Sequence, residues 1–143
     1  MKQIISTLFL IFFLIIKIYG QDKVTEKYPI DIKLEKCLSI DSNYTTLGMV
    51  NCTLVALDEW DKEMNKYYKL LIGKLNEDEK EKLKNSQKEW LAFRDKEIEF
   101  SNLLYDNMQG TMWHISMAMT KLDLTKQRSI NLKIYFDTIT FDK

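Results

Sequence analysis

The chain has 143 residues, of which 45% are hydrophobic and 29% are charged. Lysine and arginine together number 21, as do aspartate and glutamate, so the surface offers neither the basic stripe that a nucleic-acid backbone requires nor a strong acidic field. This length supports a single modest core, and we expect one domain.

Residues 1–20 have the pattern of a secretory signal peptide. Lys2 supplies the positive start, an apolar run covers residues 4–16, and Gly20 offers a small residue for cleavage. The run is short for a bilayer span and Lys17 ends it, so an uncleaved anchor is the weaker interpretation. No cysteine stands at the cut, which argues against a lipoprotein. Loss of the two lysines leaves 19 basic against 21 acidic residues, a net charge of −2.

The exported part of the chain holds both cysteines, Cys37 and Cys52. An even count in a small secreted domain favours one disulfide, and closing a loop of about fifteen residues would contribute roughly 3 kcal/mol to stability. The alternative, a metal-binding pair, is less favoured because no second cysteine or histidine lies near either one. We therefore expect a periplasmic or secreted protein.

The first half of the exported chain predicts a leader and one long helix. Residues 21–36 are polar and contain the only proline, Pro29, which predicts an extended leader. Apolar residues at helical spacing predict the first long helix over residues 46–74, with Thr45 or Thr46 as its cap.

The second half predicts further helices. A turn at residues 76–78, with Asn76 or Asp78 as the cap, starts a second long helix that runs to about residue 105. Two shorter helices are expected after it, over residues 111–121 and from Asp123 or Thr125 to about Phe136. A C-terminal tail covers residues 137–143, and residues 135–141 are either a short strand or a frayed end. The predicted fold class is all-α, an antiparallel helical hairpin with one or two further short helices and one disulfide.

One face of the second helix carries two large polar groups, Gln87 and Arg94, among apolar neighbours such as Leu83 and Trp90. An unpaired buried amide costs roughly 1 to 3 kcal/mol, and an unpaired buried charge costs more. Another segment must therefore supply hydrogen-bond partners for both groups.

The first helix offers such partners at matching steps, in Asp61, Asn65 and Tyr68. An antiparallel hairpin would bring Asp61 beside Arg94, which predicts an ion pair, and Asn65 and Gln87 could bond one another or the backbone. The set is either an internal network that fixes helix register or a binding surface that awaits a ligand. We favour the internal network because its acid, base and amides balance one another and leave no surplus reactive group.

No catalytic or metal site is predicted. His114 is the only histidine, so a structural or surface role is favoured over a metal site or a triad. Glycine-rich phosphate loops, serine elbows and metal-ligand spacings do not occur. A cell-wall hydrolase would need a reactive carboxylate in a cleft, for which Asp61 and Glu63 are the candidates. We expect neither an enzyme nor a cofactor.

The break after the second helix is the predicted contact surface. Trp113 follows a glycine-containing loop, where a tryptophan can anchor a protein or a sugar, although burial in the core is favoured. Met108, Met112, Met117 and Met119 form either an adaptable apolar surface around it or a small core. The candidate partner-binding residues are Tyr105, Gln109, Gly110, Trp113 and His114.

Several short motifs follow one another between residues 37 and 132. They are Cys37, Thr46, Met49 and Cys52, then Asp61-x-Glu63-Met64-Asn65-x-x-Tyr68, Leu83-x-x-x-Gln87-x-x-Trp90-x-x-x-Arg94-Asp95, Gly110-Thr111, and Leu124-Thr125-x-x-Arg128-x-x-x-Leu132. This set resembles the LprI-like family of small exported bacterial proteins, and we assign residues 37–136 to that domain. Many relatives hold a second cysteine pair, where this chain has Ile98 and Thr120.

The resemblance implies an all-helical exported domain with a Cys37–Cys52 disulfide and inhibition of lysozyme as its function, without supplying an inhibitory residue. It adds Arg128 to the expected structural polar network. Lysozymes are commonly basic proteins with an acidic cleft, so we expect a protruding basic or polar loop, for which residues 105–114 are the candidate. The alternative is an envelope interaction or scaffold protein that has no lysozyme role and binds through Trp113 and its methionines. Neither nucleic acid nor a membrane span after signal cleavage is expected.

Overall fold

The computed structural model describes residues 27–141, which form four α-helices, one 3-10 turn and no strand. The predicted signal peptide lies outside the described residues. The all-α class with one disulfide is confirmed. In chain order the elements are α2 (Pro29–Leu38), η1 (Asp41–Asn43), α3 (Thr46–Ile72), α4 (Glu77–Asp106) and α5 (Trp113–Phe141).

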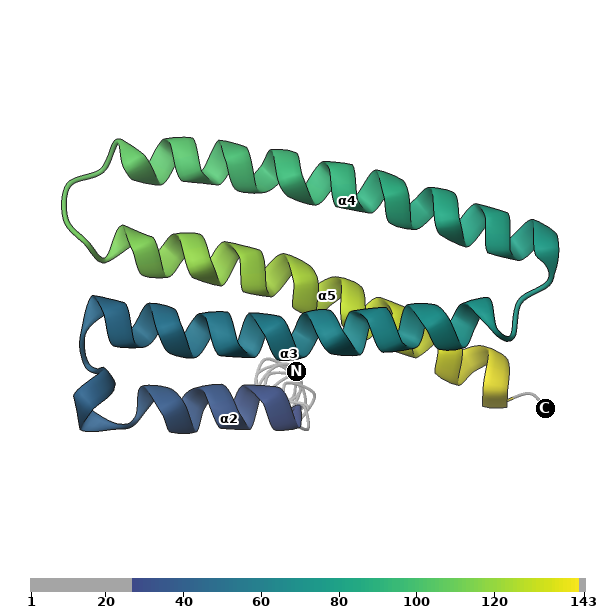
Figure 1. Ribbon diagram of the computed structural model, residues 1–143, viewed down its shortest axis with the longest axis horizontal. Coiled ribbons are helices and arrows are strands. Elements are labelled where there is room, and N and C mark those ends of the chain that lie inside the picture. Colours follow the sequence, from purple (N-terminus) through teal and green to yellow (C-terminus); the bar gives the residue numbers. More distant parts are fainter. Residues whose placement is uncertain (1–26, 142–143) are drawn as a thin grey trace, which may run out of the picture.

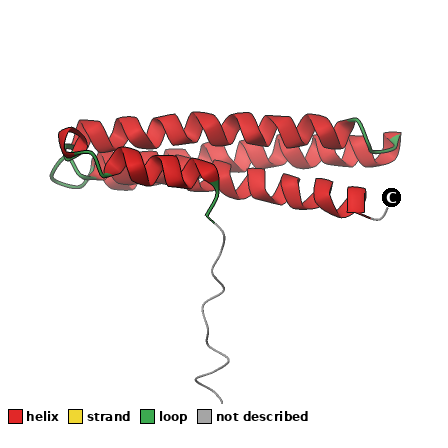
Figure 2. Cartoon of the chain, turned by 90° about the horizontal axis from the view of Figure 1, so that it is seen from below, coloured by secondary structure: helices red, strands yellow, loops and turns green. Residues whose placement is uncertain are grey.

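The three long helices share one long direction, and the N-terminal half of α5 lies between α3 and α4 (Figure 1). The C-terminal half of α5 crosses behind α3 and ends on the side of α3 that faces away from α4. α3 and α4 run antiparallel, as predicted, yet each packs mainly on α5 rather than on the other, and the α3–α5 contact is the most extensive. α2 packs on α3 along the edge away from α4. Figure 2 shows that short loops at the two ends join helices that share one long direction. The fold is therefore a row of α4, the N-terminal half of α5, α3 and α2, which the C-terminal half of α5 leaves by crossing α3.

Capped N-termini set the starts of α3 and α4, as the sequence predicts. Thr45 Oγ1 accepts a hydrogen bond from the backbone N–H of Gly48 at 3.0 Å. Asn76 Oδ1 accepts from the backbone N–H of Glu79 at 3.0 Å, and the Glu79 carboxylate accepts from the backbone N–H of Asn76 at 2.9 Å. This reciprocal capping box fixes the turn between the two helices.

The core lies along the contact between α3 and α5, in two groups of buried side chains. The first group includes Trp60 of α3 and Leu122 of α5, and Ile30 of α2 packs against it. The second joins Met64 of α3 to Leu132 of α5 and takes only half-buried side chains from α4. α4 is therefore attached to a core that the other helices already form.

The extended leader predicted over residues 21–36 is wrong where the structure describes it, because α2 begins at Pro29. Proline suits the first turn of a helix, where its missing N–H leaves no hydrogen bond unmade. Tertiary contacts fix the start of α2: Ile30 is buried, Asp31 pairs with Lys126 of α5 at 2.7 Å, and the ring of Tyr28 packs edge-on against Trp60 at 5.2 Å. These tertiary contacts order a segment whose composition is that of a loop.

The division of the C-terminal part into two short helices and a tail is also wrong. Residues 113–141 form the single helix α5, since no proline or glycine interrupts them. The possible caps at Asp123 and Thr125 lie inside this helix. Thr125 is buried there, and its hydroxyl donates to the carbonyl of Lys121 at 3.0 Å, a bond that a threonine inside a helix can make.

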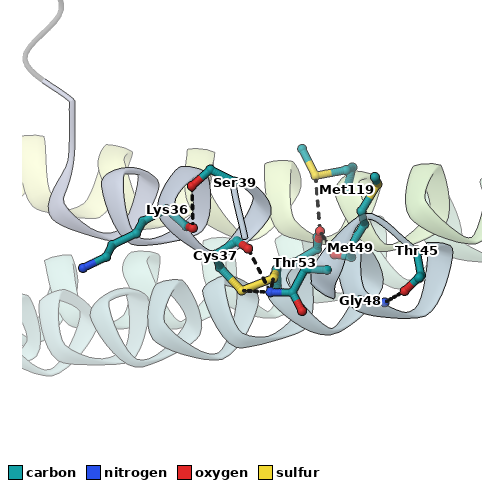
Figure 3. The surroundings of a disulfide bond; sticks show 10 residues. Lys36, Cys37, Ser39, Thr45, Gly48, Met49, Thr53 and Met119 are labelled. Atoms are coloured by element: carbon teal, nitrogen blue, oxygen red, sulfur yellow. Dashed lines mark hydrogen bonds between the residues drawn. A yellow bond between two sulfur atoms is a disulfide. The ribbon is translucent and has the colours of Figure 1, made fainter. Parts of the chain in front are cut away.

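The predicted disulfide joins Cys37 of α2 to Cys52 of α3 (Figure 3). The amide Nδ2 of Asn43 donates to the carbonyl of Cys37 at 2.9 Å, so η1 folds back over the bridge. Gly48 makes this approach possible: a Cβ atom there would lie 2.7 Å from the Cα of Asn43 and 2.8 Å from its carbonyl oxygen. The disulfide, η1 and the start of α3 therefore form one compact corner.

Replacing both cysteines, as Cys37→Ser with Cys52→Ser, should lower the free energy of unfolding by about 3 kcal/mol, because the unfolded chain regains the freedom of its loop. Urea unfolding followed by circular dichroism measures the change. Wild-type protein unfolded in a reductant is the control and should show the same loss. An unchanged midpoint in both samples would contradict the role given to the bridge.

Gly48→Ala should lower the free energy of unfolding by about 1–3 kcal/mol, since its methyl group meets backbone atoms that no side-chain rotation can move. Gly73→Ala is the matched control, because a Cβ there meets its nearest atom, the carbonyl oxygen of Leu70, at an ordinary 3.5 Å. Thermal unfolding of both variants tests this. Equal melting temperatures for the two would show that the corner has more room than the distances indicate.

Candidate functional site

Arg128 of α5 is the arginine at the centre of the polar network. It is 9% exposed, its Nε donates to Oε1 of Gln87 at 2.9 Å, and its Nη2 donates to Oγ of Ser86 at 3.2 Å. The guanidinium also lies 5.8 Å from the ring centre of Trp90, close enough for a cation–π contact. Burial lowers the pKa of Arg128 below the ordinary arginine value. The guanidinium therefore donates its hydrogen bonds to neutral acceptors and lies against an aromatic face, and these contacts stabilise its charge.

The predicted ion pair between Asp61 and Arg94 is wrong. Arg94 bonds instead to its neighbour Asp95 at 2.8 Å and lies over the ring of Trp90, while Asp61 accepts from the amide of Asn65 at 2.9 Å. The cause is the position of α5, which lies between the helices that carry the two predicted partners.

The other predicted members of the network divide between the helices. The amide Nε2 of Gln87 reaches α3, but at Sδ of Met64, 3.8 Å away, rather than at Asn65. Tyr68 packs against the second core group. The structure therefore joins Gln87 with Arg128 and leaves Asp61, Asn65 and Arg94 in local pairs.

Ser86 is a member of the network that sequence reasoning missed, and Arg128 entered only through the family resemblance. A signal for Arg128 was present: it stands three residues after Thr125 and four before Leu132, in line with buried positions of a predicted helix. A second signal was the spread of apolar residues around the whole circumference of α5, which is typical of a helix enclosed on several sides.

The loop between α4 and α5 has a defined shape. The rings of Tyr105 and Trp113 stack with their centres 5.8 Å apart and their planes 13° apart, and the indole N–H of Trp113 donates to the carbonyl of Gln109 at 2.9 Å. Gly110 has a φ of 97°, a conformation that glycine adopts without strain. The hydroxyl of Thr111 lies 3.0 Å from that of Thr46 and ties the loop to the start of α3.

The methionines around Trp113 divide between surface and interior. Met108 and Met112 are 44% and 63% exposed, whereas Met119 packs against the first core group and lies 3.7 Å from the hydroxyl of Thr53. His114 is exposed and lines a shallow groove between α3 and α5. The structure thus brings all five candidate partner-binding residues to one end of the row of helices.

The groups considered for chemistry are held in ordinary surface pairs. The carboxylate of Glu63 pairs with Lys66 at 3.0 Å, and Asp61 bonds within its own helix. Among residues 27–141, no three histidine, cysteine, aspartate or glutamate side chains come together as metal ligands. None of the helices that the structure describes is long and apolar enough to cross a membrane.

Comparisons with known proteins point to one family. The family model described as Lysozyme inhibitor LprI matches residues 37–132. A crystal structure of a protein of Burkholderia thailandensis, described as uncharacterized, superposes with a TM-score of 0.73 at 28% sequence identity. The likeness covers 78% of this chain and 55% of that one, so this chain spans about half the length of that relative. A search of curated proteins finds none that matches.

The pairing of Gln87 with Arg128 can be tested by a double-mutant cycle. Gln87→Leu should lower the free energy of unfolding by about 1–3 kcal/mol, because it removes one of the two hydrogen-bond acceptors of a buried guanidinium. Combined with Arg128→Met, the loss should be smaller than the sum of the two single losses. Denaturant unfolding of the four proteins measures this coupling.

The control cycle uses Asp61→Asn and Arg94→Met, the pair that the sequence predicted and the structure separates. Its coupling energy should be zero within error, since additivity holds for residues that share no partner. Coupling in this cycle, together with none between Gln87 and Arg128, would restore the predicted hairpin packing.

Proposed function

This chain belongs to the LprI family, and from that membership we propose that it is an extracytoplasmic protein that inhibits lysozyme by binding it. The observation that carries the proposal is the match of the lysozyme-inhibitor family model to residues 37–132. The Cys37–Cys52 disulfide fits an oxidising compartment outside the cytoplasm.

Inhibition by this protein requires a rigid surface and no reacting group, because a partner that occupies the cleft of an enzyme excludes its substrate. The loop that joins α4 to α5 meets that requirement. The stack of Tyr105 on Trp113 and the bond from Trp113 to Gln109 hold its shape before any partner arrives. Little conformational freedom is then lost on binding, which favours affinity.

The chemistry of the loop is polar and apolar rather than basic. Residues 105–114 contain no lysine or arginine, and their one carboxylate is Asp106. The exposed side chains of Met108 and Met112 give the loop its apolar contact area, and methionine adapts its shape to a partner surface. We infer that the loop contributes shape and apolar contact, and that any attraction of charge comes from elsewhere on the protein.

A second candidate function is an envelope interaction or scaffold protein with no lysozyme role. The exposure of Met108 and Met112 beside Trp113 favours a scaffold protein as much as it favours an inhibitor, since such a surface fits many protein partners. A pull-down from periplasmic extract separates the two functions: an endogenous envelope partner supports the scaffold, and recovery of added lysozyme alone supports the inhibitor.

Titrating the protein, expressed as the full chain and purified from the exported fraction, against lysozyme should reduce the hydrolysis of cell walls in a concentration-dependent way. Met112→Ser should weaken inhibition about tenfold, which corresponds to 1.4 kcal/mol of contact energy. The turbidity of a cell-wall suspension gives the rate.

Ile134→Ser is the matched control, because Ile134 is comparably exposed but lies in the C-terminal half of α5, away from the loop. It should inhibit as the wild type does. Lysozyme activity that stays constant at a large molar excess of wild-type protein, across several lysozyme classes, would disprove the proposed function.

A further inference from the structure

α4 has an outer surface that no other part of the described chain covers. Its contacts are mainly with α5, and of its 30 residues only Ser101 is buried. A helix attached along one side in this way presents its other sides to solvent, and the residues on those sides are free to serve a partner.

Five residues of α4 share one such side, which we name the α4 stripe. Each stands one position before a residue of the side that packs on α5, which includes Trp90, Ser101 and Tyr105. One residue along a helix is a rotation of about 100°, so the stripe lies beside the packed side rather than in it. At helical steps of four, four, three and four, the α4 stripe consists of Glu89, Phe93, Glu97, Phe100 and Leu104.

The apolar members of the stripe are well exposed: Phe93 is 52% exposed, Phe100 56% and Leu104 46%. Leu103, beside them, is 63% exposed. Single exposed apolar residues are normal on a protein surface. Two phenylalanines and two leucines exposed along one helix surface present more apolar area than a single residue does, and such an area favours a contact site.

Charge distinguishes the C-terminal part of α4, residues 89–106, from its N-terminal part. Residues 89–106 contain five acidic and two basic residues, a net charge of −3, whereas residues 77–88 contain four of each. Arg94, one of the two basic residues, is engaged by Asp95. Glu89 and Glu97 form no ion pair with any residue of the described range. The stripe therefore alternates unpaired carboxylates with exposed apolar side chains.

We propose that the α4 stripe is the docking surface for a cationic protein, which under the proposed function, on which this inference rests, is a basic lysozyme. Phe93 and Phe100 supply aromatic anchors, and such residues carry a large share of binding energy at interfaces. Glu89 and Glu97 pair with lysine or arginine side chains of the partner, which speeds the encounter and fixes its orientation.

The stripe leads into the loop described above. Leu104 stands four positions before Met108, whose backbone N–H still bonds to the carbonyl of Tyr105 at 3.0 Å. The apolar side chains thus continue past the end of α4 into the loop. The stripe adds Glu89 and Glu97 to the single carboxylate of the loop, Asp106, and together they give one contact surface for a basic enzyme.

A second copy of the chain fits the stripe less well than a cationic partner does. In either orientation, pairing two stripes would set Glu89 and Glu97 against the acidic half of another α4. Like charges placed across an interface oppose association, so charge complementarity selects a basic partner over self-association.

Two variants of the full-length protein test the stripe, Phe100→Ser and Glu97→Lys. Each should raise the dissociation constant for a basic lysozyme about tenfold or more, measured by surface plasmon resonance. Glu99→Lys is the matched control for Glu97→Lys. It changes the net charge of the same helix segment equally, but two residues away it turns to the other side of the helix, and it should change affinity less than about threefold.

The outcomes separate the stripe from the function on which it rests. If wild type binds lysozyme, and both stripe variants bind it with the same affinity and show a native circular dichroism spectrum, the stripe is not the docking surface and the proposed function stands. If wild type binds no lysozyme, both the proposed function and the assignment of the stripe are disproved. If sedimentation shows a wild-type dimer that Phe100→Ser dissociates, a second copy occupies the stripe and the cationic partner is disproved.

Discussion

The contact between α3 and α5 is the constraint on which the rest of the structure depends. α3 buries Trp60 and Met64 against α5, whose Leu122 and Leu132 are almost completely enclosed. Each such side chain contributes roughly 1.5–3 kcal/mol by leaving water. Because the apolar face of α3 is buried against α5, α4 packs on another side of α5. The short turn between α3 and α4 would otherwise favour direct packing of these two helices on each other.

The polar chemistry of the interior follows from this arrangement. Gln87 and Ser86 of α4 accept hydrogen bonds from α5 rather than bonding to the polar side chains of Asp61, Asn65 and Tyr68 on α3. The buried charge that they hold is therefore that of Arg128. Hydrogen bonds to neutral acceptors and the ring of Trp90 stabilise the charge of Arg128, and no carboxylate of the described range forms an ion pair with it. Because its hydrogen bonds are made within the protein, the guanidinium of Arg128 is not free to bind a ligand, and its contacts fix the position of α4 on α5.

Recognition is left to surfaces that the row of helices does not enclose. An outer position for α4 exposes the α4 stripe along its length, and the aromatic stack of Tyr105 on Trp113 closes the loop at its end. At the same end of the row, the disulfide and the close approach at Gly48 tie α2 to the start of α3. The proposed binding function is compatible with this division, because contact residues can change without disturbing the residues that hold the helices together.

Sequence alone determined the local features: the bounds of α3 and α4 within two residues, two candidates for each cap, of which the structure selects Thr45 and Asn76, the disulfide, and the break at Gly110. Each of these depends on residues close together in the chain or, for the bridge, on the only cysteines available. Tertiary structure decided that α2 is a helix, that α5 is unbroken, and that Gln87 meets Arg128 rather than Asn65. Periodicity shows that a helix has an apolar face but not which helix will cover it, and that choice is made by competition among all the faces for burial.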